Sequence, residues 1–142
     1  MNLIFVPAQE SDLDLLFRLN KNLIDTYEDL ATIDYPRVLQ WVRKNLEHNL
    51  PHFTRVLCDG TVAGFFCLTN EGEKQELDSF FVLPEFQNQG IGTAVLQNCL
   101  KDIPVYLYVF TRNTRAIALY QRLGFRITQN VGTTRCIMEY TP

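Results

Sequence analysis

Two glycines one residue apart, Gly90 and Gly92, stand where a predicted strand runs into a predicted helix. Glycine allows the backbone to approach a phosphate group closely, and the N–H groups of a first helical turn have no partner within the helix. The helix dipole adds partial positive charge at the same end. The residue types and their spacing therefore predict a phosphate-binding turn in the segment that begins at Gln87.

Two common phosphate-binding motifs do not fit this turn. A Walker A loop requires Lys and then Ser or Thr directly after its last glycine, whereas Gly92 is followed by Thr93 and then alanine. A dinucleotide fingerprint requires a third glycine and an acidic residue at the end of the next strand, and both are missing here. Because paired glycines also occur in strand–helix turns for packing reasons, the turn alone is weak evidence for phosphate binding.

A second motif lies about twenty residues later and reads NTRAIALYQRLGF over residues 113–125. The Gln87-x-x-Gly90-x-Gly92 turn and the Asn, Ala, Leu-Tyr and Leu-Gly-Phe spacing together resemble the two motifs of the GNAT superfamily of acetyl-CoA-dependent N-acetyltransferases. The resemblance covers roughly residues 74–127 in the expected order. It is specific for the superfamily and says little about the acceptor.

The resemblance implies that acetyl-CoA is a co-substrate. In this superfamily the strands that correspond to residues 75–83 and 105–109 splay apart, and the pantetheine arm lies between them, which implies pairing with backbone groups of Phe81 and Val82. Asn113 is expected to hold the pantetheine or a substrate amide, and a helix N-cap is a compatible alternative role. The predicted cofactor-binding residues of the turn are Gln87, Asn88, Gln89, Gly90, Ile91, Gly92 and Thr93.

The resemblance also implies the catalytic residues. A primary amine is mostly protonated at neutral pH, so the site must remove a proton, stabilise an oxyanion and return a proton to the leaving thiolate. Glu76 stands where the superfamily often has its general base, and Tyr120 stands where it has the proton donor. Strand alternation predicts that Asp78 shares a face with Glu76, as do Phe80 and Val82. Solvated strand acids and a packed tyrosine are the structural alternatives.

The turn departs from the superfamily pattern in its charge. Family members commonly carry basic residues before the first glycine, whereas Gln87, Asn88 and Gln89 are all neutral. Phosphate binding would then depend on backbone N–H groups and the helix end. Lys101, Arg112 and Arg115 are the candidate sources of positive charge for the adenosine 3′-phosphate.

The segment between the first two predicted helices, residues 25–35, usually shapes the acceptor site in this superfamily. Its acidic and aromatic residues, among them Tyr27 and Glu28, would suit a cationic amine, with Asp78 as a further candidate; a solvated polar loop is the alternative. Three functions stay open. They are acetylation of a small-molecule amine, acetylation of a protein N-terminus or lysine, and CoA binding without turnover in a regulatory module.

Composition agrees with one globular N-acetyltransferase domain over residues 1–142. The net charge of −3 offers no basic face for nucleic acid, and no apolar run reaches the length of a membrane span. Four scattered cysteines without Cys-x-x-Cys or histidine at metal spacing predict reduced core thiols, no metal site and a cytoplasmic location. A homodimer is left open.

Periodicity predicts an α+β fold. A strand at residues 3–6 precedes a helix capped by Ser11, and a second helix begins at Pro36 with an apolar stripe that includes Trp41. An Asp59-Gly60 hairpin comes next, and then β-helix-β-helix-β-β from residue 75 onward. This order predicts a mixed, mostly antiparallel sheet flanked by about four helices, with residues 75–83 and 105–109 as parallel neighbours. That these two strands splay apart is implied by the resemblance to the GNAT superfamily.

Overall fold

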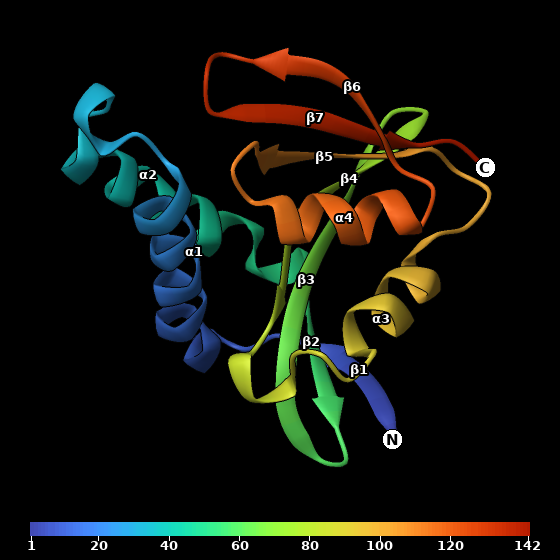
Figure 1. Ribbon diagram of the computed structural model, residues 1–142. Helices are drawn as coiled ribbons and strands as arrows, with labels where there is room; N and C mark the ends of the chain where they lie inside the picture. Colours follow the sequence, from blue (N-terminus) through green and yellow to red (C-terminus); the bar gives the residue numbers. More distant parts are fainter.

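A computed structural model of the protein describes residues 1–142 and contains one seven-stranded mixed sheet, with strand order β1-β2-β3-β4-β5-β7-β6 (Figure 1). The strands are β1 (Leu3–Pro7), β2 (Phe53–Cys58), β3 (Thr61–Glu71), β4 (Lys74–Val82), β5 (Val105–Phe110), β6 (Arg126–Val131) and β7 (Arg135–Tyr140). All neighbouring strands are antiparallel except β4 and β5. This sheet and its helices confirm the predicted GNAT-like fold class.

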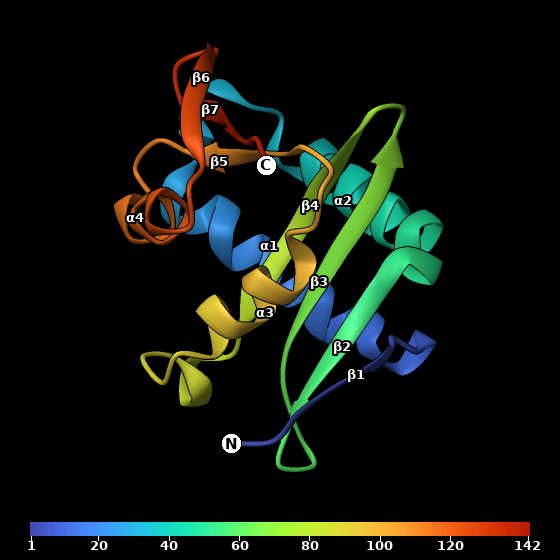
Figure 2. The same cartoon turned by 90° about the vertical axis from the view of Figure 1, so that its right-hand side faces the viewer.

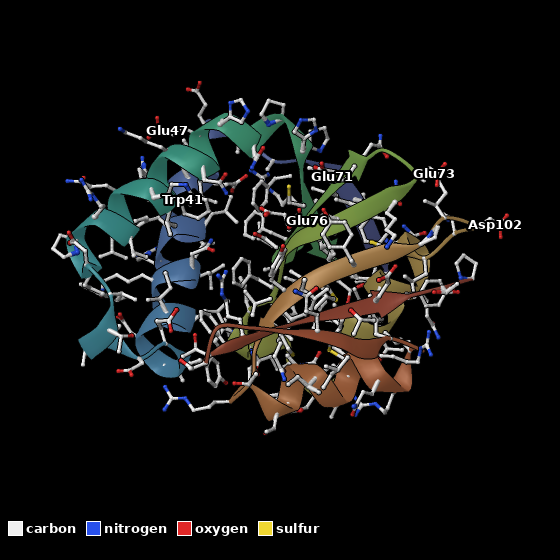
Figure 3. The ribbon with its side chains drawn as sticks, turned by 90° about the horizontal axis from the view of Figure 1, so that it is seen from above. Trp41, Glu47, Glu71, Glu73, Glu76 and Asp102 are labelled. Carbon is white, nitrogen blue, oxygen red and sulfur yellow. The ribbon has the colours of Figure 1, made fainter.

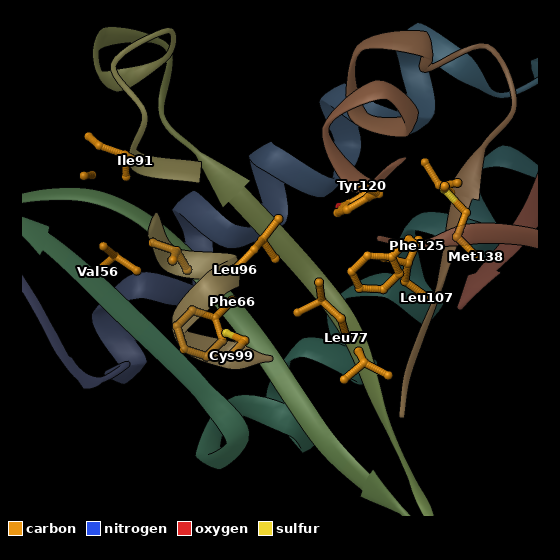
Figure 4. Close-up of a cluster of buried hydrophobic side chains, with 14 of the residues drawn as sticks. Val56, Phe66, Leu77, Ile91, Leu96, Cys99, Leu107, Tyr120, Phe125 and Met138 are labelled. Carbon is orange, nitrogen blue, oxygen red and sulfur yellow. The ribbon is translucent and has the colours of Figure 1, made fainter. Parts of the chain in front are cut away.

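Four α-helices cover the two faces of the sheet in pairs (Figure 1). They are α1 (Leu13–Tyr27), α2 (Tyr35–Asn49), α3 (Ile91–Cys99) and α4 (Thr114–Arg122). One hydrophobic core lies under α3 and α4, and Figure 4 shows part of it around Phe66, Leu96 and Phe125. A second core, which includes Leu16, Phe65 and Phe81, lies under α1 and α2.

The helix starts follow capping chemistry, with one correction. Asp34 accepts a hydrogen bond from the N–H of Arg37 and caps α2, and Pro36 lies in the first turn as predicted. The prediction that Ser11 caps the first helix is wrong. Gln9 and Asp12 form a capping box around a short 3₁₀ turn instead, and α1 begins after it.

The parallel neighbours β4 and β5 are joined only at one end. Their register contains two pairs, Gln75 with Val105 and Glu76 with Tyr106. Beyond Glu76, β4 continues along β3, and β5 continues along β7. The sheet therefore opens into a splay, visible in Figure 2 as the different directions of β4 and β5.

A β-bulge in β4 overturns the predicted sharing of faces. Cys67 pairs with Ser79 but Leu68 pairs with Leu77, so Asp78 is an extra residue and the alternation changes parity there. Leu77, Phe80 and Val82 all contact the core under α3 and α4. Glu76 therefore lies on the opposite face from Phe80 and Val82, toward α1 and α2.

The predicted hairpin between β2 and β3 forms with Cys58 opposite Thr61, and all four cysteines are unpaired and buried. No helix combines the length and apolar character that crossing a bilayer requires. No three His, Cys, Asp or Glu side chains lie close enough together to hold a metal ion.

Candidate active site

A cavity of about 860 Å³ runs through the splay and reaches both helix layers. Its walls come from α1 and α2 on one face of the sheet, from β4 and β5 in the gap, and from α4 and the turn at residues 86–93 on the other face. Every catalytic, cofactor-binding and acceptor-binding residue predicted from the sequence lines this cavity except Gln89. Of the three candidate cations for the 3′-phosphate, Arg115 lines it and Lys101 and Arg112 do not. Gln89 instead donates a side-chain hydrogen bond to the carbonyl of Glu85.

The turn before α3 leaves its backbone open to the cavity. Asn88 and Gly90 have left-handed φ angles of 62° and 81°, which bend the chain into the helix. A Cβ added at Gly90 would meet no atom within 4 Å, so this glycine is required for its backbone conformation and not for packing. The first-turn residues Ile91, Gly92 and Thr93 line the cavity, and N–H groups at this end of a helix suit an anion such as a diphosphate.

Side-chain amides hold this turn in place. Gln87 donates through Nε2 to the carbonyl of Val82 at 3.0 Å and accepts through Oε1 from Arg115 at 3.0 Å. Asn88 accepts through Oδ1 from the same guanidinium at 2.8 Å. Arg115, the third residue of the second motif, thus reaches from α4 to the neutral turn.

Along the edge of β4 that faces the gap, the backbone N–H and carbonyl groups of every second residue are not paired with β3. The N–H of Leu83 donates to the carbonyl of Ala63, and Phe81 is directly opposite Phe65. The backbone groups of Phe81 therefore face β3, and those of Val82 and Phe80 face the gap left by β5. Of the two residues predicted to pair with pantetheine, Val82 has its backbone groups on the open side, where its carbonyl accepts from Gln87 and its N–H remains available.

Glu76 lies at the point where β4 and β5 part, and Figure 3 shows it between α2 and β5. Tyr106, its partner across the strands, donates a hydrogen bond from its hydroxyl to Oε1 of Glu76 at 3.2 Å. Burial raises the pKa of Glu76, the charge of Asp78 raises it further, and the Tyr106 hydrogen bond offsets part of this effect. The result is a carboxylate that accepts protons more readily than an ordinary glutamate.

Asp78, the extra residue of the bulge, also lines the cavity. Burial raises its pKa, and so does the charge of Glu71. Neither Glu76 nor Asp78 forms an ion pair; the carboxylates that do are Asp12, Asp14, Asp25, Glu47 and Glu139. This end of the cavity therefore carries negative charge that no protein cation neutralises.

Tyr120 lies on the other side of the gap, in the core under α4 (Figure 4). Tyr120 is 8% exposed, and its hydroxyl has no hydrogen-bond partner. Every fully buried side-chain polar atom in the protein has a partner, so the Tyr120 hydroxyl must keep some exposed surface. Tyr120 is one of the residues that line the cavity. Burial raises its pKa, so the phenol stays protonated at neutral pH.

The N-terminal end of α4 and the C-terminal end of α1 also line the cavity. Asn113 accepts through Oδ1 from the N–H of Ala116 at 3.2 Å, which confirms the cap role and leaves its amide nitrogen free. The ring of Tyr27 stacks on Phe110, with centroids 6.2 Å apart. Arg112 donates to the carbonyls of Tyr27 and Glu28, so this candidate phosphate cation is engaged elsewhere.

Three residues at the site were not predicted from the sequence. The apolar stripe predicted for α2 includes Trp41, but this side chain is 65% exposed and lines the cavity (Figure 3). Tyr106 belongs to no motif, and only the register of β4 with β5 shows that it meets Glu76. Arg135 also reaches the cavity, with its guanidinium 5.6 Å from the centre of the Tyr108 ring.

Comparison with known proteins agrees with this geometry. The model of the Acetyltransferase (GNAT) family matches residues 17–125. The chain is 25% identical over 114 residues to the peptidyl-lysine N-acetyltransferase YjaB of Salmonella typhimurium, covering 80% of this chain and 76% of that one. It is 33% identical over 64 residues to the spermine/spermidine N(1)-acetyltransferase of Bacillus subtilis, covering 40% and 42%.

Among solved structures, the PaiA N-acetyltransferase of Thermoplasma acidophilum in complex with coenzyme A superposes with a TM-score of 0.75. The two chains are 20% identical, and each is covered completely. The family match spans most of the chain, and the turn, the open edge of β4 and the cavity provide the surfaces that coenzyme A requires. The chain belongs to the GNAT family of acetyltransferases, with acetyl-CoA as its co-substrate.

Proposed function

We propose that the protein acetylates the primary amine of a small cationic molecule by direct attack within a ternary complex. The observation that carries this proposal is the position of Glu76 and Tyr120 on opposite sides of one continuous gap, the first with a raised pKa and the second with an unpaired hydroxyl. One group is suited to accept a proton from the amine, and the other to serve the leaving sulfur.

The acceptor arrives as an ammonium ion and needs a base. Glu76 accepts one of its protons, which frees the lone pair for attack on the thioester carbonyl carbon. The N–H groups along the edge of β4 are suited to receive the oxyanion that then forms. The new C–N bond remains when the C–S bond breaks, and the surplus proton on nitrogen leaves to water.

Tyr120 acts on the leaving group. Its protonated phenol donates to the sulfur as the C–S bond breaks, and water restores the lost proton. Burial keeps the phenol protonated, so it is present in the donor form at every pH at which Glu76 begins to ionise. In this role Tyr120 influences turnover far more than CoA affinity.

The charge of the acceptor side supports a cationic molecule. Glu28, Glu76 and Asp78 line the cavity without an ion pair, and Trp41 presents an exposed ring on the same side of the sheet. Carboxylates and aromatic faces both attract ammonium groups. The spermine/spermidine acetyltransferase relative acts on amines of this kind. The four unpaired cysteines support a reducing, cytoplasmic location.

Acetylation of a protein lysine is the second candidate. The exposure of Trp41, 65% of its surface, leaves the acceptor side open enough for a side chain on a larger partner. The relative YjaB is a peptidyl-lysine N-acetyltransferase. A lysine side chain and a polyamine both present a primary amine on a short alkyl chain. The two candidate acceptors differ in the group at the other end of the alkyl chain, which is a peptide backbone in one and a further amine in the other.

An acceptor panel separates these candidates. Release of the CoA thiol is measured with a monoamine, a diamine, spermidine, spermine and a lysine-containing peptide, beside the Asp78→Asn variant. We expect kcat/KM to rise with the number of positive charges, and Asp78→Asn to reduce it for spermine more than for the monoamine. Equal values for monoamine and spermine would contradict the cationic acceptor, and a preference for the peptide alone would favour the second candidate.

A further inference from the structure

The diphosphate of CoA carries negative charge, but the turn before α3 contains no positively charged side chain. Gln87, Asn88 and Gln89 are neutral, and no Lys or Arg lies between β4 and Leu100. Backbone N–H groups can hold a phosphate, yet a guanidinium adds a full charge and a planar pair of donors. A cation from elsewhere in the chain is therefore needed at this turn if the site is to match a charged diphosphate.

Arg115 is the cation that touches the turn. Its Nη1 donates to Gln87 at 3.0 Å and its Nη2 to Asn88 at 2.8 Å, and it lines the same cavity as Gly90 and Gly92. Both acceptors are uncharged amide oxygens. Arg115 forms no salt bridge with a carboxylate, so its charge is not neutralised within the protein. A guanidinium has five N–H donors, which leaves several for a ligand.

The remaining candidate cations are placed differently. Arg112 donates to the carbonyls of Tyr27 and Glu28 at the end of α1. The guanidinium of Arg135 lies over the Tyr108 ring. Lys101 follows the far end of α3 and does not line the cavity. Arg122 lines the cavity from the last turn of α4, about ten ångströms along the helix from Arg115 at 1.5 Å per residue.

We propose that Arg115 binds the diphosphate of CoA and supplies from α4 the charge that the turn before α3 lacks. Gln87 and Asn88 then have a defined role, because their amide oxygens hold the guanidinium over the turn in the absence of ligand.

The test measures binding by calorimetry and needs no acceptor, so its outcome does not depend on the proposed acetylation of a cationic amine. The variants are Arg115→Gln, Arg115→Lys and the matched charge control Arg126→Gln, which lies on the exposed strand β6 outside the cavity. Each is titrated with CoA and with dephospho-CoA, which lacks the 3′-phosphate and keeps the diphosphate, at low and high salt. Thermal unfolding of each variant verifies that it is folded.

We expect Arg115→Gln to raise the Kd for both ligands about 10- to 100-fold and to flatten its salt dependence. Arg115→Lys should recover much of the affinity, and Arg126→Gln should bind as the unaltered protein does. A Kd within twofold of the unaltered protein would overturn the proposal. So would a loss confined to CoA, which would assign Arg115 to the 3′-phosphate, or equal losses for Gln and Lys, which would make it an uncharged brace of the turn.

Discussion

Replacing Tyr106 by phenylalanine tests how the site sets the protonation of Glu76. The substitution removes the 3.2 Å hydrogen bond to Oε1 and leaves the ring in place. That bond lowers the pKa of Glu76 against the opposing effects of burial and Asp78. Without it the pKa of Glu76 rises, so a larger fraction of the base is protonated and inactive at any pH on the acid side.

The size of the effect can be worked out from the geometry of this bond. A hydrogen bond to a charged group contributes about 1.5–3 kcal/mol, but this one is long and Glu76 is only half-buried, so water replaces part of it. We expect about 1 kcal/mol, which corresponds to roughly a fivefold fall in kcat/KM on the acid side. At high pH, where Glu76 is ionised in both proteins, the two values should converge.

The assay is the pH dependence of kcat/KM for the acceptor at saturating acetyl-CoA. Tyr108→Phe is the matched control, because Tyr108 packs edge-on against Tyr106 with centroids 6.4 Å apart but has no hydrogen bond to Glu76. The acid limb should move to higher pH in Tyr106→Phe and stay in place in Tyr108→Phe. A limb that stays in place or moves to lower pH in Tyr106→Phe would refute the reasoning about Glu76.

Three further substitutions have defined outcomes. Gly90→Glu should abolish CoA binding in calorimetry, since it puts a carboxylate at the phosphate turn. The control is Gly132→Glu on the β6–β7 turn, where the glycine also has a left-handed φ (60°) and open surroundings, and this variant should bind CoA normally. Equal loss of binding in both variants would implicate backbone strain. Tyr120→Phe should lower kcat about 10²–10⁴-fold with an unchanged Kd for CoA, and full turnover would remove Tyr120 from the mechanism. Gly64→Ala should destabilise the fold by about 1–3 kcal/mol or more in thermal unfolding, because its Cβ would lie 2.1 Å from the carbonyl oxygen of Phe81; an unchanged Tm would show that β3 and β4 can shift apart freely.

The parts of the site that lie within one segment could be predicted from sequence. The turn from Gln87 to Thr93 carries its left-handed glycine and its helix start within a few residues, so its conformation is largely local. The same holds for the cap Asn113 and for the start of α2 after Asp34. In each case the physical cause, a left-handed glycine or a capped N–H, is carried by the residues themselves.

The parts that depend on pairing between strands could not be predicted. Period-two alternation places Glu76 on the same face as Phe80 and Val82, and the bulge at Asp78 reverses that relation. A bulge depends on the register with β3, and nothing in the β4 residues alone specifies it. Tyr106 meets Glu76 for the same kind of reason, since their contact is found only once β4 and β5 are aligned.

Long side chains are the second source of difference between the prediction and the structure. Arg115 is one of three candidate cations in the sequence, and only the tertiary arrangement shows that α4 brings it to Gln87 and Asn88 while Arg112 binds the end of α1. The apolar stripe of α2 includes Trp41 by periodicity, but that helix packs through Val42 and Leu46 and leaves the indole at the cavity.

The most direct test of the central claim is a crystal structure of the protein with CoA and a spermine acceptor. We predict that the sulfur lies in the gap between β4 and β5, within hydrogen-bonding reach of the Tyr120 hydroxyl, and that the terminal amine approaches from the side of Glu76. The diphosphate should lie on the turn before α3. A sulfur outside the gap, or an amine on the α4 side of the sheet, would contradict the proposed mechanism.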